Sequence, residues 1–231
     1  MTEHPILVND QVSRNIRAGL QTQDRRPMKV QPSGKVVDVR WDGHSQSWAA
    51  LIDPPCGSEL IDGALRFRSP YGTAGDRLWF REAHEIMFDM GEGLGHPCEV
   101  VFRSDFACHP CHNETPLGAE LLPASGYSEP CHPYWRPSIH MPRWACRTTA
   151  IVKRVWVERI GGISEEDARA EGIDRPYCAA SAENYYTAWV KGKCIENQSA
   201  VSVFEHLWSA LYPGSWDRNE WVWCCEFEVE R

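Results

Sequence analysis

The sequence contains no long apolar run and no surplus of basic residues. No apolar run approaches the roughly 18 residues that a membrane-spanning helix needs, and residues 1–9 lack the charged start and long apolar middle of a secretory signal. We therefore expect a cytoplasmic protein with no membrane partner. The formal net charge of −8 excludes a protein that coats nucleic acid through bulk electrostatics. A small positive cleft on an acidic body remains compatible with this charge.

The glycine patterns of dinucleotide- and triphosphate-binding proteins are also missing. The sequence has neither a Rossmann fingerprint nor a phosphate loop, so nucleotide-triphosphate chemistry is not expected. Of the 231 residues, 42% are hydrophobic and 11% are aromatic, which is enough for a sizeable core. The length favours one domain, residues 1–231, that carries an insertion.

Local patterns predict a strand-rich α+β protein. Alternating runs predict strands at 28–32, 35–41, 65–68, 77–83, 99–105, 146–160 and 221–229. Amphipathic spacing and capping residues predict helices after Asn9 or Asp10, at 164–172 and at 199–212. The last strand is expected to be half-buried, because apolar residues share one of its faces: Trp221, Trp223, Cys225, Phe227 and Val229. These elements indicate a small, mostly antiparallel β-barrel with a few peripheral helices.

The segment from about 85 to 135 differs from the rest of the chain. Glycine, proline, histidine and cysteine accumulate there, and we interpret it as an inserted lobe. The chain has 10 cysteines but no export signal. Reduced thiols, some of them on a metal, are therefore expected rather than disulfides.

Within this lobe, CHPCHNE has the C-x-x-C spacing with which two thiolates reach one tetrahedral Zn²⁺. We predict a structural zinc site formed by Cys98, Cys108, Cys111 and Cys131, with His109, His112 and His132 as substitute ligands. Metal binding would hold a long loop that has few core residues. The alternatives are unrelated thiols in a reducing cell, a disulfide formed on isolation, or a catalytic zinc with three protein ligands and a water.

Four segments in the same order resemble the ASCH domain, a branch of the PUA-like superfamily. GLQTQDRR, residues 19–26, is similar to the family signature G-x-K-x-x-E-x-R. PYGTAGDRLWFRE, WRPSIHMPRWACR and SWDRNEWVWCCEFE, at 70–82, 135–147 and 215–228, look like the other marks of the ASCH proteins common in phages and prophages. The resemblance covers nearly the whole chain outside the inserted lobe.

This resemblance implies a PUA-like β-barrel with a cleft beside the signature segment, in a superfamily associated with RNA or modified-nucleotide binding. Some relatives are enzymes, including a small amidohydrolase that acts on acetylated cytidine and ribonuclease-like members. Gly19 and Arg26 match the signature, Asp24 stands where it has Glu, and Gln21 occupies the lysine position. Glu171 matches an acidic partner of the amidohydrolases. Because an amide nitrogen is neither basic nor nucleophilic, the pair of lysine and acid is incomplete.

The polar residues of the signature segment predict contacts with an anion or a base. Arg25 and Arg26 can hold a phosphate bidentately, and Gln21 and Thr22 can bond a base edge. The alternative is that the arginines pair with carboxylates such as Asp24, or cap the preceding helix.

The segment PSIHMPRW supplies a second group of candidates. On an expected strand, alternation places Ser138 and His140 on one face, which we assign to the cleft with Arg143. Trp144 or Trp79 offers an aromatic face on which a base can stack. His140 is equally well explained as a hydrogen-bonded core histidine.

Three functions follow from these observations. The first is a module that binds RNA, single-stranded DNA or a modified nucleoside. The second is a hydrolase of the same family in which Thr22, Asp24, His140 or Glu171 acts as acid or base without the lysine. The third is a phage accessory protein that binds a protein partner through the inserted lobe, which the acidic net charge favours. We expect binding rather than catalysis.

Overall fold

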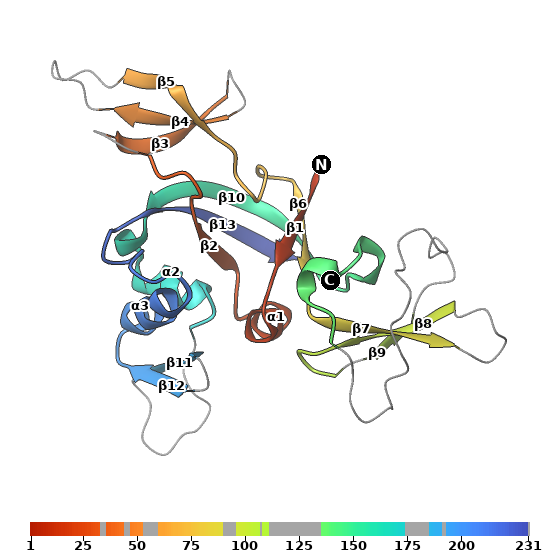
Figure 1. Cartoon of the computed structure of the whole chain (residues 1–231). Helices are drawn as coiled ribbons and strands as arrows, with labels where there is room; N and C mark the ends of the chain where they lie inside the picture. Colours follow the sequence, from red (N-terminus) through yellow and green to blue (C-terminus); the bar gives the residue numbers. More distant parts are fainter. Residues whose placement is uncertain are drawn as a thin grey trace.

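The computed structural model describes residues 1–32, 36–43, 47–52, 60–89, 96–106, 108–110, 135–173, 185–190 and 193–230. Its centre is a five-stranded sheet in the order β1-β6-β10-β13-β2 (Figure 1). The strands are β1 (Glu3–Leu7), β6 (Arg77–Arg81), β10 (Thr149–Arg159), β13 (Trp221–Val229) and β2 (Gln23–Pro27). β1 runs parallel to β6, and the other neighbours in this sheet are antiparallel.

The two edge strands of the central sheet approach each other at one end. Arg26 on β2 donates from Nη2 to the carbonyl oxygen of Leu7, at the end of β1, over 2.8 Å. The sheet is therefore strongly curved. Among the described residues β1 and β2 share no hydrogen-bonded ladder, so the sheet is not closed into a barrel there. The expected strand-rich α+β class is confirmed.

A second, antiparallel sheet packs on one face of the central sheet. It consists of β3 (Val36–Asp42), β4 (Ser47–Ile52) and β5 (Leu60–Phe67). Its buried residues join those of the central sheet in one hydrophobic core. The rings of Trp48 and Trp223 meet edge to face across this core with their centroids 5.4 Å apart, a geometry that contributes about 0.5–1.5 kcal/mol beyond area burial.

Helices cover the other face of β10 and β13. α2 (Glu165–Ala170) and α3 (Ala200–Leu211) form a second core there with the hairpin of β11 (Tyr186–Val190) and β12 (Lys193–Asn197). β13 buries Trp223 in the first core and Val222 and Cys224 in the second. The prediction of a half-buried last strand is therefore wrong, because the helices cover the face expected to be solvated.

The helix ends follow the expected chemistry. Asn9 Oδ1 accepts from the Val12 N–H over 2.9 Å and caps α1 (Asp10–Arg17). Ser164 and Ser199 cap α2 and α3 in the same way. After α1, Gly19 has a φ of +73°, which side-chain-bearing residues rarely adopt. None of the described helices is long and apolar enough to cross a membrane.

A third antiparallel sheet extends from the central sheet into the predicted inserted lobe (Figure 1). It contains β7 (His84–Asp89), β8 (His96–Phe102) and β9 (Cys108–Pro110). An isolated bridge pairs His84, at its base, with Arg136, so the two ends of the lobe lie side by side.

Three local predictions are wrong. No strand forms at 28–32, because the Gln31 side chain takes the place of the ladder: Nε2 donates to the Trp221 carbonyl over 3.0 Å, and Oε1 accepts from the Trp221 N–H over 2.8 Å. The expected strand at 138–143 is replaced by two 3₁₀ turns, Ser138–His140 and Arg143–Ala145, each preceded by a proline, which has no N–H for a ladder. Most of the expected signature loop is strand β2.

Candidate functional site

The signature segment lies between α2 and the last strand. Gln21 forms an isolated antiparallel bridge with Glu171. The Thr22 N–H donates to the Ala170 carbonyl, and the Thr22 carbonyl accepts from the Phe227 N–H, each over 2.9 Å. The structure therefore brings together Gln21, the residue at the lysine position, and Glu171, the expected acidic partner.

One face of β2 carries Asp24 and Arg26. The Asp24 carboxylate accepts from Arg26 Nε and from the Tyr71 hydroxyl, both over 2.8 Å. Tyr71 is fully buried in the first core. Burial, reinforced by the negative charge of Asp24, raises the pKa of Tyr71 well above its usual range, so this hydroxyl stays a donor.

The other face of β2 carries Arg25, whose side chain is fully buried. Nε donates to Glu158 and Nη1 to Glu171, each over 2.9 Å, and Nη2 lies 3.5 Å from Asp167 Oδ2. Gln23 Oε1 also accepts from Nη1 over 2.8 Å. Both arginines of the signature segment thus pair with carboxylates, as the alternative interpretation has it, and Arg25 lies in the interior.

Three carboxylates surround the single guanidinium of Arg25. One positive charge does not neutralise three negative charges in a buried place. Burial raises the pKa of Glu171 to about 7, and the negative charge of Asp24 acts in the same direction. The positive charge of Arg25 acts in the opposite direction but does not outweigh them. Glu171 therefore exchanges a proton near neutral pH, a property typical of acid–base groups.

Gln21 is a neutral neighbour of this carboxyl group. It is 1% exposed, and its Nε2 donates to the Gln23 carbonyl over 3.0 Å. Its Oε1 is buried and has no hydrogen-bond partner. Gln21 stands where the signature that this segment resembles has lysine, and its neutral amide places no positive charge beside Glu171.

Sequence reasoning missed three residues that lie near Asp24 and Glu171, namely Tyr71, Tyr212 and Cys225. Tyr71 belongs to a segment that resembles the ASCH domain, which was the only signal for it. Burial also raises the pKa values of Tyr212 and Cys225, and the negative charges of Asp24 and Glu171 act in the same direction on both. Nothing in the sequence indicates Tyr212, which follows α3, and Cys225 was expected only as a core residue.

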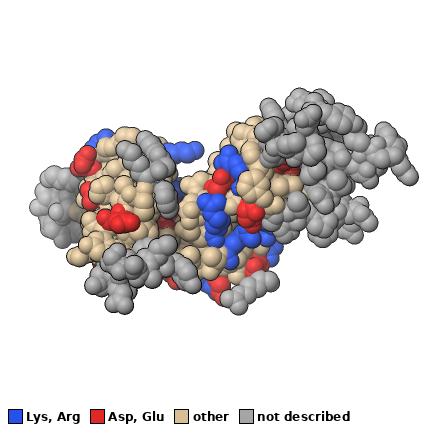
Figure 2. Space-filling model, turned by 90° about the horizontal axis from the view of Figure 1, so that it is seen from below, with Lys and Arg blue, Asp and Glu red and all other residues tan. Residues whose placement is uncertain are grey.

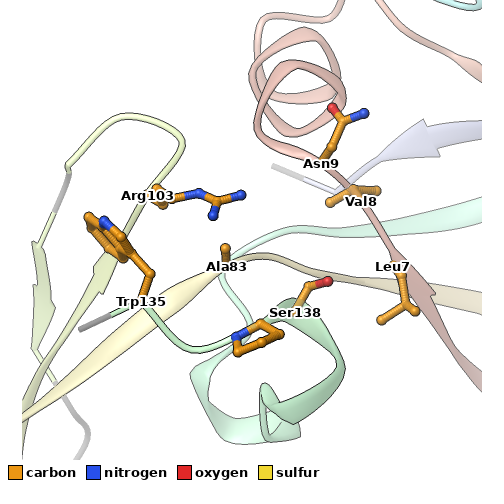
Figure 3. Close-up of a pocket in the computed structure, with 8 residues that line it drawn as sticks. Leu7, Val8, Asn9, Ala83, Arg103, Trp135 and Ser138 are labelled. Atoms are coloured by element: carbon orange, nitrogen blue, oxygen red, sulfur yellow. The ribbon is translucent and has the colours of Figure 1, made fainter. Parts of the chain in front are cut away.

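A hollow of about 410 Å³ lies at the end of β1, next to the contact between Arg26 and Leu7 (Figure 3). We call it the pocket; its lining residues are Leu7, Val8, Asn9, Ala83, Arg103, Trp135, Pro137 and Ser138. The Arg103 guanidinium points across it toward the start of α1 (Figure 3), where Nε donates to Asp10 over 2.8 Å. Trp135 is held edge to face on Phe106 with centroids 5.6 Å apart. The pocket thus combines an indole, a guanidinium and small polar groups.

Lysine and arginine side chains gather beside the pocket on the underside of the molecule, around α1 (Figure 2). Ion pairs and hydrogen bonds join α1 to the end of β8 through Arg14, Arg17, Arg103 and Arg147, which we call the α1 arginine patch. Its carboxylate partners are Asp10 and Asp105 at the surface and the buried Glu82, which pairs with Arg147. Four arginines against three carboxylates leave a small local surplus of positive charge on an acidic protein.

The other predicted ligand-binding residues are spread over this side of the central sheet. Ser138 lines the pocket, and Trp144 is half-buried against the small core around Phe102. Arg143 donates from Nε and Nη2 to the Glu3 carboxylate over 2.7 and 2.9 Å. His140 is exposed, so it is not a core histidine.

The predicted zinc ligands lie only partly within the described residues. Cys98 is on β8 and Cys108 on the neighbouring β9. Cys111 and Cys131 fall outside the described residues, as do His112 and His132. Within the described ranges, no group of three or more His, Cys, Asp or Glu is placed to hold a metal ion. The zinc site stays a prediction.

Comparison with protein-family models, with curated proteins and with solved structures finds no match to this chain. The likeness to ASCH domains therefore depends on the four sequence segments and on what the structure brings together around them.

Proposed function

We propose that the protein binds RNA, single-stranded DNA or a modified nucleotide, with the pocket and the α1 arginine patch as its contact surface. The observation that carries this proposal is the pocket itself, where Trp135, Arg103 and Ser138 meet in a hollow of about 410 Å³. Bases of single strands stack on aromatic side chains, while arginines hold the phosphates. A net charge of −8 leaves such a local patch as the surface suited to a polyanion.

The proposed fold is that of a PUA-like domain, in which the curved central sheet is the barrel wall. The Arg26 contact with Leu7 supports this interpretation, because it holds the two edge strands together beside the pocket. In this arrangement the signature segment is a framework: Asp24, Arg26 and Tyr71 fix the end of β1, from which Leu7 lines the pocket.

The electrostatic part is tested by fluorescence anisotropy of a short labelled RNA and its DNA counterpart over a salt series. Replacing both exposed arginines of α1, in the variant Arg14→Gln/Arg17→Gln, is expected to weaken binding about tenfold or more. The slope of log K against log salt should decrease by about 1.4, at about 0.7 for each lost phosphate contact. The matched control is Lys153→Gln/Arg154→Gln, which removes two exposed cations from β10.

Base stacking is tested separately at Trp135. Trp135→Ala is expected to weaken binding by about 1–3 kcal/mol, whereas Trp135→Phe keeps an aromatic face and loses less. The proposal fails if the β10 control loses as much affinity as the α1 variant, or if Trp135→Ala binds both strands as tightly as the parent.

A second candidate function is hydrolysis of an amide, as in acetylated cytidine, or of RNA. It is favoured by one observation, the pKa of about 7 of a buried Glu171 paired with Gln21. Thr22 and Asp24 lie on the same segment. Incubation with acetylated cytidine and with short RNA, followed by chromatography, tests it. We expect no turnover; turnover by the parent that disappears in Glu171→Gln would replace binding by catalysis as the function.

A further inference from the structure

The segment 135–140 has a second face, opposite to the pocket. The His84 N–H donates to the Arg136 carbonyl over 3.1 Å, and the Arg136 N–H donates to the His84 carbonyl over 2.7 Å. In paired extended chains, successive side chains point to opposite sides. Since Ala83 and Pro137 line the pocket, His84 and Arg136 point away from it.

His84 and Arg136 have two basic neighbours, Arg81 and His140. We call these four residues the cationic cluster. Burial, and then the positive charges of Arg136, Arg81 and His140, lower the pKa of the His84 imidazole. Arg81 is fixed by Nη2, which donates to the carbonyl of Ile139 in the same 3₁₀ turn as His140. Arg81 on β6, Arg136 in the bridge and His140 in this turn are therefore all close enough to His84 on β7 to act on its charge.

Among the described residues no carboxylate pairs with a member of the cationic cluster. Glu82, the chain neighbour of two members, is held by Arg147, and Glu3 is held by Arg143. Burial lowers the pKa of Arg81, and no carboxylate offsets it. Arg81 differs in this respect from the more deeply buried Arg147, which pairs with carboxylates. The cluster has the charge for an anion and no internal counter-charge.

Two atoms of the cluster are buried without a hydrogen-bond partner, Nε2 of His84 and Nε of Arg81. His84 is 0% exposed, and its Nδ1 lies 3.1 Å from the Glu82 carbonyl oxygen. A carbonyl only accepts, so Nδ1 carries the hydrogen and Nε2 of the neutral ring presents a lone pair. Buried polar groups are nearly always paired, and two unpaired atoms in one cationic group mark a ligand site.

We propose that the cationic cluster binds a phosphate group that carries one proton, as in inorganic phosphate or the terminal phosphate of a nucleotide or a nucleic-acid strand. The phosphate hydroxyl donates to Nε2 of His84, and the remaining oxygens accept from Arg81 and Arg136. His140, which is exposed, lies at the solvent side of the site.

The lone pair of His84 discriminates between anions. Sulfate, and the phosphodiesters within a strand, carry no proton near neutral pH and offer no donor to Nε2. They bind only after His84 takes up a proton from water, which burial and the positive charges of Arg136 and Arg81 oppose. A phosphomonoester, with a second pKa of about 6, carries this proton in about a tenth of its molecules at about pH 7, and this protonated form is the one that binds.

Calorimetric titration at neutral pH with inorganic phosphate and with sulfate tests this proposal. Phosphate is expected to bind at least about tenfold more tightly than sulfate, and Arg136→Gln to weaken phosphate binding about tenfold, the effect of one charge-assisted hydrogen bond. Arg154→Gln, an exposed arginine of β10, is the matched control and should leave binding unchanged. Because His84 is buried, it is followed without mutation: its Nε2 nuclear magnetic resonance signal should shift on adding phosphate.

Oligonucleotides with and without a 5′-phosphate distinguish the sources of the group. Tighter binding of the phosphorylated strand than of both the unphosphorylated strand and inorganic phosphate assigns the site to strand ends, and equal binding of the two strands assigns it to the free ion. Equal affinity for sulfate, an unmoved Nε2 signal, or unchanged phosphate binding by Arg136→Gln would overturn the proposal. It does not depend on the proposed function, because Trp135→Ala and the α1 double variant should bind inorganic phosphate like the parent.

Discussion

Replacing Glu171 by glutamine should change how stability depends on pH. The carboxyl group has a pKa of about 7 in the folded protein and an ordinary pKa of 4.5 in an unfolded chain. A raised pKa means that the folded state binds the proton more tightly. The associated stability is fully present below pH 4.5 and is lost as the pH rises through 7. From these two values the loss between pH 5 and pH 8 is about 2–3 kcal/mol.

Urea unfolding of parent and Glu171→Gln at pH 5 and pH 8 measures this loss. The glutamine carries no charge at either pH, and all other titrating groups are shared, so they cancel in the difference between the two proteins. The parent should lose about 2–3 kcal/mol relative to Glu171→Gln on going to pH 8, or roughly 5–10 °C in melting temperature. Glu166→Gln, at an exposed position of the same helix, is the control and should differ from the parent by about 0.5 kcal/mol or less at both pH values.

A difference between parent and Glu171→Gln that is the same at pH 5 and pH 8 would refute the reasoning. It would mean that Arg25 neutralises Glu171 even though two other carboxylates share the same guanidinium. A difference that grows in favour of the parent at pH 8 would reverse the sign, and Glu171 would then be stabilised as an anion.

Three further substitutions test the packing around the site by chemical unfolding. Gly172→Ala should cost about 1–3 kcal/mol, because Gly172 has a φ of +88° and an added Cβ would lie 2.6 Å from a side-chain amide of α1; Gly162→Ala, with nothing within 4 Å, is the control. Glu82→Gln leaves the Arg147 side chain, 6% exposed, without its nearest counter-charge and should cost about 3–5 kcal/mol; a cost under about 1 kcal/mol would show that Asp105 suffices. Ser164→Ala removes the α2 cap and should cost about 1 kcal/mol, and no loss would show that the cap is dispensable.

Elements whose signals are local can be predicted from the sequence. The caps of α1 and α2, the apolar spacing of α3 and the alternation of β10 depend on residues within a few positions of one another, and these predictions are confirmed. β2 could not be predicted in this way. Its sequence QDRRP alternates no apolar residues. It is a strand because β13 lies beside it and because carboxylates from β10 and from α2 with its C-terminal end pair with Arg25.

The site was predictable only where the resemblance supplied its members. Gln21 and Glu171 lie far apart in the chain, and the family pattern was the only reason to pair them. His84 and Arg136 had no such signal. They lie at the two ends of the inserted lobe, and only the tertiary structure brings them together in a bridge. Alternation misplaced Ser138 and His140, since it presupposes a strand where Pro137 and Pro142 impose turns.

The position of β13 also decides when the protein can fold during synthesis. This strand lies between β10 and β2, both of which leave the ribosome earlier, and it supplies residues to both hydrophobic cores. Until it emerges, β2 has no strand partner in the sheet and β10 has one open edge, which favours association between nascent chains. Neither core is therefore complete before β13 has left the ribosome, and losing Trp221–Val229 would remove residues from both cores at once.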